Sequence, residues 1–236
     1  MPIQQMLLGS GGAVATKTYV DDVFSTYLWG GNNTDNRAIN NGIDLSGEGG
    51  MVWTKMRNDT SDHLLSDTVR GVGNYLRTNN NTANTAYTNR VKSFTSTGFT
   101  IGTDADVNGY NSNPGDLQYS SWTFRKSSMF DVVTYTGNGS ARTIAHSLGS
   151  IPGMIIIKRT DTTKDWCVYH RSIGNSKHLE LNNTDAEYGS TTRWNATDPT
   201  ASVFSVGDNA QVNSSSGTYV AYLFGGGEST QNEAVS

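Results

Sequence analysis

The sequence predicts an all-β protein: two tandem antiparallel β-sandwich domains of jelly-roll or lectin-like type, preceded by a short N-terminal anchoring segment with one short helix. Three observations predict this fold. Hydrophobic residues make up 35% of the chain and charged residues 16%, and the remainder is rich in Gly, Asn, Thr and Ser, which are poor in helix interiors. Apolar segments are short and separated by turn-forming groups, and one unit of sequence occurs twice.

The internal repeat determines the expected number of domains. Gly50–Lys55 (GMVWTK) matches Gly153–Lys158 (GMIIIK), which begins 103 positions later. Three further matches follow in the same order: Leu76–Asn80 with Leu179–Asn183, Phe99–Gly102 with Phe204–Gly207, and Tyr119–Phe124 with Tyr219–Phe224. Two copies at this spacing indicate two self-contained domains rather than a solenoid, and we assign them to residues 31–128 and 129–226.

The short apolar segments are the expected strands of each copy. In the first copy they are Met51–Lys55, Phe94–Ile101 and Tyr119–Phe124. In the second copy they are Val132–Tyr135, Met154–Lys158, Trp166–Tyr169, His178–Leu181, Val203–Val206 and Tyr219–Phe224. Turn-forming pairs such as Pro152-Gly153 and Asn182-Asn183 separate them, which is typical of antiparallel sandwiches.

Residues 1–30 precede the repeat and are expected to form an anchoring and oligomerisation segment. A helix over Thr16–Tyr27 would carry one apolar face, and a helix of about three turns needs a partner for such a face. The candidate partners are the chain's own sandwich, a symmetry-related copy and a larger assembly, and we expect a homotrimer in which these faces meet at the axis. The expected contacts are Ile3, Met6, Leu7, Leu8, Val20, Phe24 and Tyr27. At the other end, residues 227–236 are expected to form a flexible tail.

Composition and charge argue against several classes of partner. The chain has no run of about 18 apolar residues, so no membrane insertion is expected. A net charge of -4 without a Lys/Arg cluster argues against nucleic acid. The single cysteine, Cys167, permits no internal disulfide and is expected to be a buried apolar side chain. The N-terminus lacks the features of a secretory signal, which predicts synthesis in a cytoplasm.

Two loops resemble binding motifs, and neither leads us to expect a cofactor or metal. Gly11–Thr18 is close to a phosphate-binding loop but lacks its second glycine, which the backbone needs to wrap phosphates. Asp104, Asp106 and Asn108 have the alternate oxygen ligands of a calcium loop, although Gly115 stands where a bidentate Glu is required. We interpret this segment as a polar turn between strands, with calcium binding as the alternative.

The sequence contains no arrangement typical of catalysis, and we expect a non-enzymatic protein. The four histidines show no zinc-ligand spacing, and no G-x-S-x-G elbow occurs. A glycosidase is the enzymatic alternative. It would require that a carboxylate pair such as Asp21 and Asp22, or Asp185 and Glu187, face each other across a cleft about 5–10 Å wide.

Tryptophans offer a second kind of candidate site. Three of them lie inside apolar strand segments and are expected in the core: Trp53, Trp122 and Trp166. Trp194 lies instead in a polar stretch, beside Arg193 and Asn195. An exposed indole next to hydrogen-bonding side chains stacks well on sugar rings. We therefore take Arg193, Trp194 and Asn195 as candidate ligand contacts.

Four segments are distinctive: Met1–Gly9 (MPIQQMLLG), Ala15–Asp22 (ATKTYVDD), Gly42–Trp53 (GIDLSGEGGMVW) and His146–Lys158 (HSLGSIPGMIIIK). They resemble segments of the tail-fibre-like virion structural proteins of tailed phages that infect marine cyanobacteria. The resemblance implies a tail fibre or tail-fibre adaptor that is synthesised in the host cytoplasm and localised to the virion tail. Its partners would be other virion tail proteins, and no catalytic residue or cofactor is implied.

A repeated β unit behind an apolar N-terminal hook fits a non-enzymatic structural protein that projects its sandwiches for host attachment. Two alternatives stay open. One is a carbohydrate-binding receptor module whose sandwich loops bind a host cell-surface glycan. The other is a capsid decoration protein.

Overall fold

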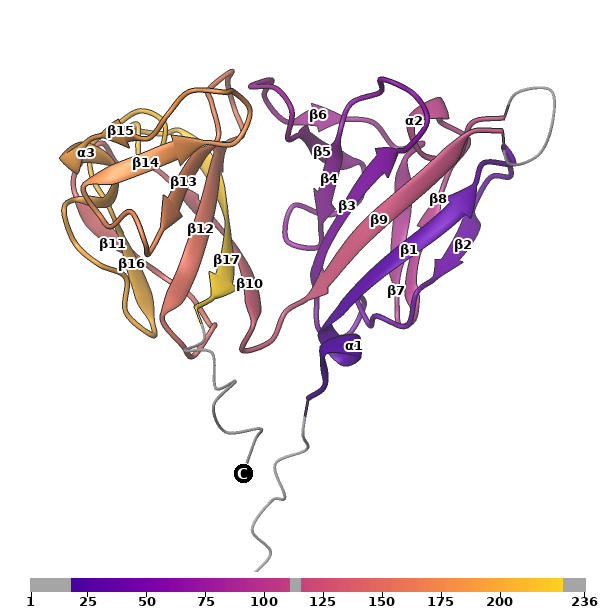
Figure 1. The fold of residues 1–236 in the computed structure, drawn as a ribbon, viewed down its shortest axis with the longest axis horizontal. Coiled ribbons are helices and arrows are strands. Elements are labelled where there is room, and N and C mark those ends of the chain that lie inside the picture. The colour runs from indigo at the N-terminus through magenta and orange to yellow at the C-terminus, as the bar shows by residue number, and fades with distance from the viewer. Residues whose placement is uncertain (1–17, 111–115, 227–236) are drawn as a thin grey trace, which may run out of the picture.

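The structure, a computed structural model, describes residues 18–110 and 116–226. It is mostly β, and its strands form two β-sandwich halves that lie side by side (Figure 1). The predicted fold class is confirmed. The helices are single turns: α1 (Val20–Val23), α2 (Ala105–Asn108) and α3 (Thr191–Trp194).

The first half packs a six-stranded sheet, in the order β1-β9-β3-β4-β5-β6, on a three-stranded sheet, β2-β8-β7. Its strands are β1 (Phe24–Gly30), β2 (Arg37–Asn40), β3 (Gly50–Met56), β4 (Leu64–Asp67), β5 (Asn74–Arg77), β6 (Thr85–Ala86), β7 (Val91–Thr95), β8 (Gly98–Ile101) and β9 (Gln118–Arg125). Neighbouring strands are antiparallel, so their side chains alternate between the core and the outer face of each sheet.

The second half repeats this arrangement, except that its small sheet has no counterpart of β7 among the described residues. Its large sheet has the order β10-β17-β12-β13-β14-β15 and faces a two-stranded sheet, β11-β16. Its strands are β10 (Phe130–Thr136), β11 (Arg142–Ala145), β12 (Pro152–Arg159), β13 (Cys167–His170), β14 (Lys177–Glu180), β15 (Tyr188–Gly189), β16 (Val203–Val206) and β17 (Thr218–Gly225). The repeat in the sequence is therefore a repeat of one topology.

The expected helix over Thr16–Tyr27 is wrong over most of its described part. Only Val20–Val23 is helical, and β1 begins at Phe24 and pairs with β9 over its whole length. The residues of β1 are aromatic or β-branched at several positions, which favours a pleated surface. β1 takes the place that β10 takes in the second half, so the first sandwich begins at Phe24 rather than at residue 31.

Each sandwich has its own core, and the two cores use the same aromatic arrangement. In the first half, Trp29 stacks on Tyr119 with ring centroids 5.6 Å apart. In the second half, Tyr135 stacks on Tyr219 at 5.1 Å. All four side chains connect the edge strand of a large sheet to its neighbour, which explains why β1 is an integral strand of the first sandwich.

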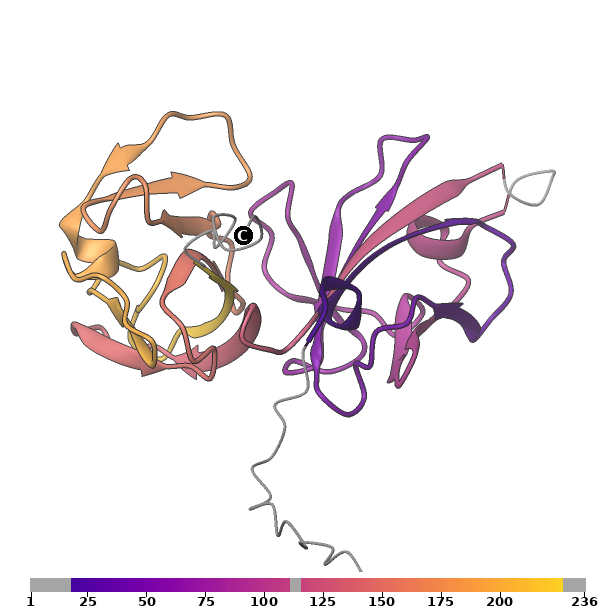
Figure 2. The same cartoon turned by 60° about the horizontal axis from the view of Figure 1, so that its bottom comes forward.

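A third apolar cluster joins the two halves through the outer faces of their large sheets. The first half contributes Met51, Leu65 and Leu76, and the second contributes Phe130, Val132, Ile156, Trp166, Val168, Val220 and Tyr222. The turned view in Figure 2 shows the same side-by-side arrangement and the short crossing between β9 and β10. The two sandwiches are thus fused by packing as well as by the chain.

Four phenylalanines lie near the junction of the two halves, on the side where β1 begins, the chain crosses from β9 to β10, and β17 ends. Phe124 contacts the rings of Phe24, Phe130 and Phe224 at centroid distances of 4.6, 5.4 and 5.4 Å. Phe130 also contacts Phe224 at 5.3 Å. This phenylalanine cluster holds both ends of the described chain together.

Candidate functional site

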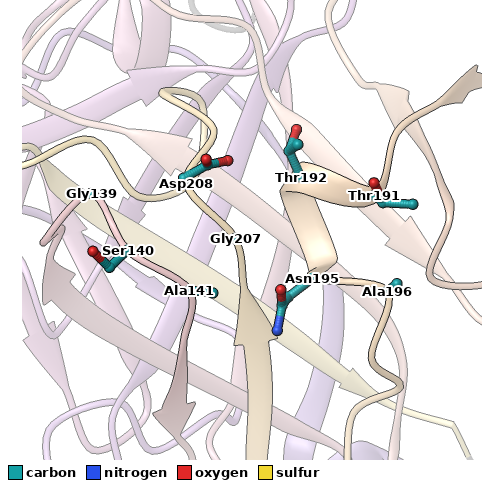
Figure 3. A pocket seen from close by; sticks show the side chains of 9 residues that line it. All are labelled: Gly139, Ser140, Ala141, Thr191, Thr192, Asn195, Ala196, Gly207 and Asp208. Atoms are coloured by element: carbon teal, nitrogen blue, oxygen red, sulfur yellow. The ribbon is translucent and has the colours of Figure 1, made fainter.

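A polar pocket of about 450 Å³ opens on the second half (Figure 3). It lies between the segment that leads into β11, the helix α3, and the end of β16. Its lining residues are Gly139, Ser140, Ala141, Thr191, Thr192, Asn195, Ala196, Gly207 and Asp208. Hydroxyl, amide and carboxylate groups surround the opening, a set that hydrogen-bonds well to polar ligands such as sugars.

The backbone after α3 shapes one wall of this pocket. Asn195 and Ala196 both have left-handed conformations, with φ of 51° and 44°. Asn195 ends α3 as its C-cap, a role that asparagine fills readily because it tolerates positive φ. The turn presents the Asn195 side chain to the pocket.

Of the three candidate ligand contacts, only Asn195 lies at the pocket. Trp194 is 2% exposed, donates its indole N–H to the carbonyl of Lys177 at 3.0 Å, and packs on the ring of Tyr169. The expectation of an exposed, stacking Trp194 is therefore wrong. Arg193 is held by Gln211, whose Oε1 lies 2.6 Å from its Nε. The polar sequence around Trp194 hides the fact that one helical turn directs its ring into the core.

An aromatic surface lies on the outer face of the first half's large sheet. Trp53 on β3 and Trp122 on β9 are directly paired, with ring centroids 6.2 Å apart, and with His63 and Phe124 they border a hollow of about 360 Å³. Trp122 is 37% exposed, so its expected core position is wrong, and Trp53 is half-buried. The prediction for Trp166 is correct, since it has no exposed surface.

Two polar groups in this aromatic surface are poorly solvated. The indole N–H of Trp53 is buried and has no hydrogen-bond partner among the described residues. Partial burial and the nearby charge of Lys55 lower the pKa of His63 below its usual 6.5, although Asp62 opposes the shift. His63 is therefore neutral at pH 7, with one ring N–H as a donor.

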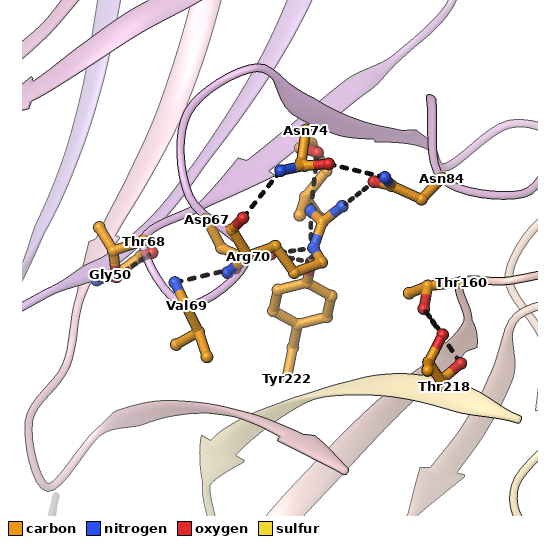
Figure 4. A network of polar contacts seen from close by, with 11 residues as sticks. Gly50, Asp67, Thr68, Val69, Arg70, Asn74, Asn84, Thr160, Thr218 and Tyr222 are labelled. Atoms are coloured by element: carbon orange, nitrogen blue, oxygen red, sulfur yellow. Dashed lines mark hydrogen bonds and ion pairs between the residues drawn. The ribbon is translucent and has the colours of Figure 1, made fainter. Parts of the chain in front are cut away.

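A buried polar network fixes the two halves to each other (Figure 4). The Tyr222 hydroxyl donates to Asp67 Oδ2 at 2.7 Å, and Arg70 Nε contacts the same oxygen at 2.6 Å. Arg70 also donates to the Tyr222 hydroxyl at 3.2 Å and to Asn84 Oδ1 at 2.7 Å. Burial raises the pKa of Tyr222 well above 10, so the hydroxyl keeps its proton. The network satisfies an ion pair that burial would otherwise penalise.

The predicted anchoring residues do not form one surface. Ile3, Met6, Leu7 and Leu8 lie outside the described residues. Val20 is 72% exposed in α1, whereas Phe24 and Tyr27 belong to β1. Residues three apart in a strand point to opposite faces, so Phe24 and Tyr27 cannot share the helical face that the sequence predicted.

The calcium-like loop is a capped turn. Asp104 accepts from the backbone of Asp106 at 3.0 Å, and both carboxylates form ion pairs with Arg90. Asn108 is fully buried, and its side-chain oxygen accepts from Asn32 and Arg37. Within residues 18–110 and 116–226, no group of three or more His, Cys, Asp or Glu side chains is placed to hold a metal ion.

Three of the four carboxylates considered for glycoside hydrolysis have other partners. Asp22 accepts from the backbone of Tyr19 at 2.8 Å beside α1. Asp185 accepts from the hydroxyl of Tyr188 at 2.6 Å, and Glu187 pairs with Lys177. In the part of the chain that the structure describes, no helix is long and apolar enough to cross a membrane.

Comparison with known proteins identifies one family. The family model described as a domain of unknown function, DUF7483, matches residues 20–229 and so covers both sandwiches. No curated protein sequence matches the chain. No solved structure matches it either.

Proposed function

This chain belongs to the DUF7483 family, and we propose that it is a non-enzymatic structural protein of a tailed-phage virion. In this role it is a tail fibre or fibre adaptor that docks through its N-terminal segment on other tail proteins and projects its sandwiches toward the host. Support comes from the four segments that resemble tail-fibre-like proteins. The homotrimer expected from the sequence is part of the same proposal.

The fusion of the two sandwiches is the observation that carries this proposal. β9 ends at Arg125 and β10 begins at Phe130, so the link is short, and Trp166 and Tyr222 are almost completely buried between the halves. A projecting element must hold its outer part at a fixed position relative to its base. A shared apolar core and a buried ion-pair network provide that rigidity.

Detection of the chain in purified phage particles is the direct test. Antibodies against the double sandwich should label the tails of intact particles. A chain that lacks residues 1–17 should fold, as judged by circular dichroism, and should be absent from particles assembled with it. Absence of the full-length chain from purified particles would refute the proposal, and incorporation of the shortened chain would refute N-terminal docking.

A second candidate function is saccharide binding in the polar pocket of the second half. The specific observation is the convergence of Ser140, Thr192, Asn195 and Asp208 on one opening (Figure 3). Asn195→Gly keeps the left-handed backbone but removes the amide, and Asp208→Ala removes the carboxylate. Both variants should lose binding to host-envelope glycans on an array, whereas Thr136→Ala, elsewhere on the second half, should retain it. The absence of glycan binding by the unaltered chain would exclude this function.

A further inference from the structure

The contact between the two halves is asymmetric, because each half uses a different part of its large sheet. Besides Met51 and Leu65, the first half contributes residues 67–84, from the end of β4 through the loop after β5, which we call the plug. The second half contributes an outer-face surface on β12 and β17 and at Trp166, directly before β13, which we call the socket. The socket is formed by Ile156, Lys158, Trp166 and Tyr222.

Backbone oxygens of the plug are bound by side chains of the socket. Trp166 Nε1 donates to the carbonyl oxygens of Arg77 at 2.9 Å and Asn80 at 3.1 Å. Lys158 Nζ donates to the carbonyl of Asn81 at 3.2 Å. As a result Trp166 and Lys158 have no exposed surface.

The first half carries an equivalent socket, and this one is open. The repeat places Trp53, Lys55, His63 and Trp122 at the positions of Ile156, Lys158, Trp166 and Tyr222. Trp122 is 37% exposed, whereas Tyr222 is 1% exposed. The Nζ atom of Lys55 donates to the carbonyl of the next residue, Met56, as that of Lys158 donates to Arg159. The aromatic hollow described above is thus an unoccupied copy of an occupied site.

The second half carries an equivalent plug, residues 170–187, which is not docked on a socket; we call it the free plug in this sense alone. Residues 183–189 are all exposed. Leu181 is 37% exposed, whereas Thr78, at the same position of the docked plug, is 3% exposed. The plug of the second half is therefore undocked, whereas the plug of the first half is docked on the socket of the second half.

The free plug already has the internal bonds of the docked plug. In the docked plug, Asn79 Oδ1 accepts from the backbone of His63 at 3.0 Å and Asn80 Oδ1 accepts from Thr82 at 3.1 Å. In the free plug the corresponding bonds run from Trp166 to Asn182 Oδ1 at 2.8 Å and from Asp185 to Asn183 Oδ1 at 3.0 Å. A loop ordered in advance loses little conformational entropy when it binds.

We propose that the open socket of the first half binds the free plug of a second copy of this chain, which repeats between molecules the contact that joins the two halves within one. Such a head-to-tail contact is heterologous, so it generates a ring if the rotation closes and a filament if it does not. The contact does not require that the chain belong to a virion.

The open pair differs from the closed pair on both of its sides. In the closed contact, the Tyr222 hydroxyl meets Asp67 and Arg70. In the open pair, Trp122 stands in place of Tyr222, and Ile173 stands in place of Arg70. An indole against an isoleucine needs no buried ion pair, so the open contact is the more apolar of the two.

The hydrogen-bond donor toward the plug is retained in the open socket. His63 stands in place of Trp166, and its neutral ring has one N–H that can donate to a plug carbonyl. The carbonyls at the positions of Arg77 and Asn80 are those of Glu180 and Asn183 in the second copy. Both sides of the proposed contact therefore have complementary groups.

Sedimentation equilibrium of the full chain tests this proposal. The unaltered chain should associate in a concentration-dependent manner. Trp122→Glu, which disables the socket, and Leu181→Glu, which disables the plug, should each weaken association by about tenfold or more. Ile151→Glu replaces a more exposed apolar side chain, 58% exposed, outside both surfaces and should associate like the unaltered chain. Near-unchanged circular dichroism and thermal unfolding would show that each variant is folded.

A mixture of the two disabled variants distinguishes a head-to-tail contact from a two-fold one. The Trp122→Glu chain keeps an intact plug, and the Leu181→Glu chain keeps an intact socket. A dimer with one of each therefore has a single intact plug–socket pair. Equimolar Trp122→Glu and Leu181→Glu chains should form dimers that contain one of each and grow no further. Dimers of the unaltered chain without mixed dimers would indicate a symmetric contact and would overturn the proposal.

Two further outcomes would also overturn it. One is an unaltered chain that stays monomeric at every concentration tested. The other is a monomeric chain whose Trp122 face binds a glycan, with binding lost in Trp122→Glu but kept in Leu181→Glu. That pattern would make the aromatic hollow a saccharide site instead of a socket.

Discussion

The hydroxyl of Tyr222 in the second sandwich donates a 2.7 Å hydrogen bond to the Asp67 carboxylate of the first. Asp67 is completely buried, and it also accepts from the backbone of Arg70 at 2.8 Å and of Val69 at 3.1 Å. The hydrogen bond from Tyr222 therefore connects the second half to the turn after β4. The Asp67 carboxylate also maintains the shape of that turn. Removal of one donor leaves a buried charge with fewer partners.

Tyr222→Phe should lower the free energy of unfolding by about 1.5–3 kcal/mol, because the lost hydrogen bond is to a buried carboxylate. Urea unfolding followed by tryptophan fluorescence measures the change. Tyr188→Phe is the matched control, since its hydroxyl also donates to a carboxylate, Asp185, but at an exposed site. The control should change stability by less than about 0.5 kcal/mol. Equal effects of the two substitutions would contradict this account of the interface.

The stability of the second half should fall between neutral and mildly acidic pH. Burial lowers the pKa of His178 from its usual 6.5 to about 4, with the Arg193 charge adding to the shift and Glu180 opposing it. The unfolded chain binds this proton near pH 6.5, and the folded chain binds it only near pH 4. The stabilising contribution is therefore complete above pH 6.5 and is lost as the pH falls from 6.5 to 4.

His178→Phe should reduce this pH dependence. The phenyl ring keeps the stacking contact with Tyr188, whose ring centroid lies 5.3 Å from that of His178, but it cannot bind a proton. Unfolding curves of both proteins at several values between pH 7 and pH 4 provide the comparison. An unchanged slope of stability against pH in the variant would assign the dependence to other groups.

Calcium and chelators should leave the melting temperature unchanged. The carboxylates of Asp104 and Asp106 are already paired with Arg90, and the side-chain oxygen of Asn108 is already an acceptor. A ligand that does not bind the folded state cannot stabilise it. Differential scanning calorimetry with millimolar calcium or EDTA should show shifts below about 1 °C. A larger rise with calcium would restore the calcium alternative.

Cys167 should react with thiol reagents only when the chain unfolds. Its side chain has no exposed surface, and burial raises the pKa of the thiol well above its usual value, so both access and thiolate content are low. Labelling with a chromogenic disulfide reagent should be slow in native buffer and fast in denaturant. Rapid labelling of the folded chain would contradict the buried position.

The sequence was sufficient to predict the double sandwich because the repeat keeps its landmarks at a nearly constant spacing. The sequence was insufficient to predict the strand β1, because Phe24–Trp29 (FSTYLW) shares only its phenylalanine with Phe130–Tyr135 (FDVVTY). The positions that match across the repeat are core and turn positions. An edge strand pairs with one neighbour only, so its residue types are less constrained than those of a central strand. The sequences of β1 and β10 are therefore too different to be matched when the two copies are compared.

The aromatic surface was missed for a different reason. Trp122 and Tyr222 are equivalent in the repeat and lie on equivalent outer faces, yet one is exposed and the other is buried. The difference depends on which half covers which face, which is a property of the assembled molecule. The alternation of side chains along β9 could have predicted the outward position of Trp122, because it puts Trp122 on the face opposite to the core residue Tyr119.

The phenylalanine cluster has a mechanical consequence. Phe24 is the first residue of β1 and Phe224 lies next to the end of β17, and both rings pack on Phe124, so the described chain begins and ends on one side of the molecule, near the junction of the two halves (Figure 1). Tension applied between the two ends bears first on these rings. The pull then acts on the ends of β1 and β17, and the rest of each sandwich lies to one side of the line between the two ends rather than along it.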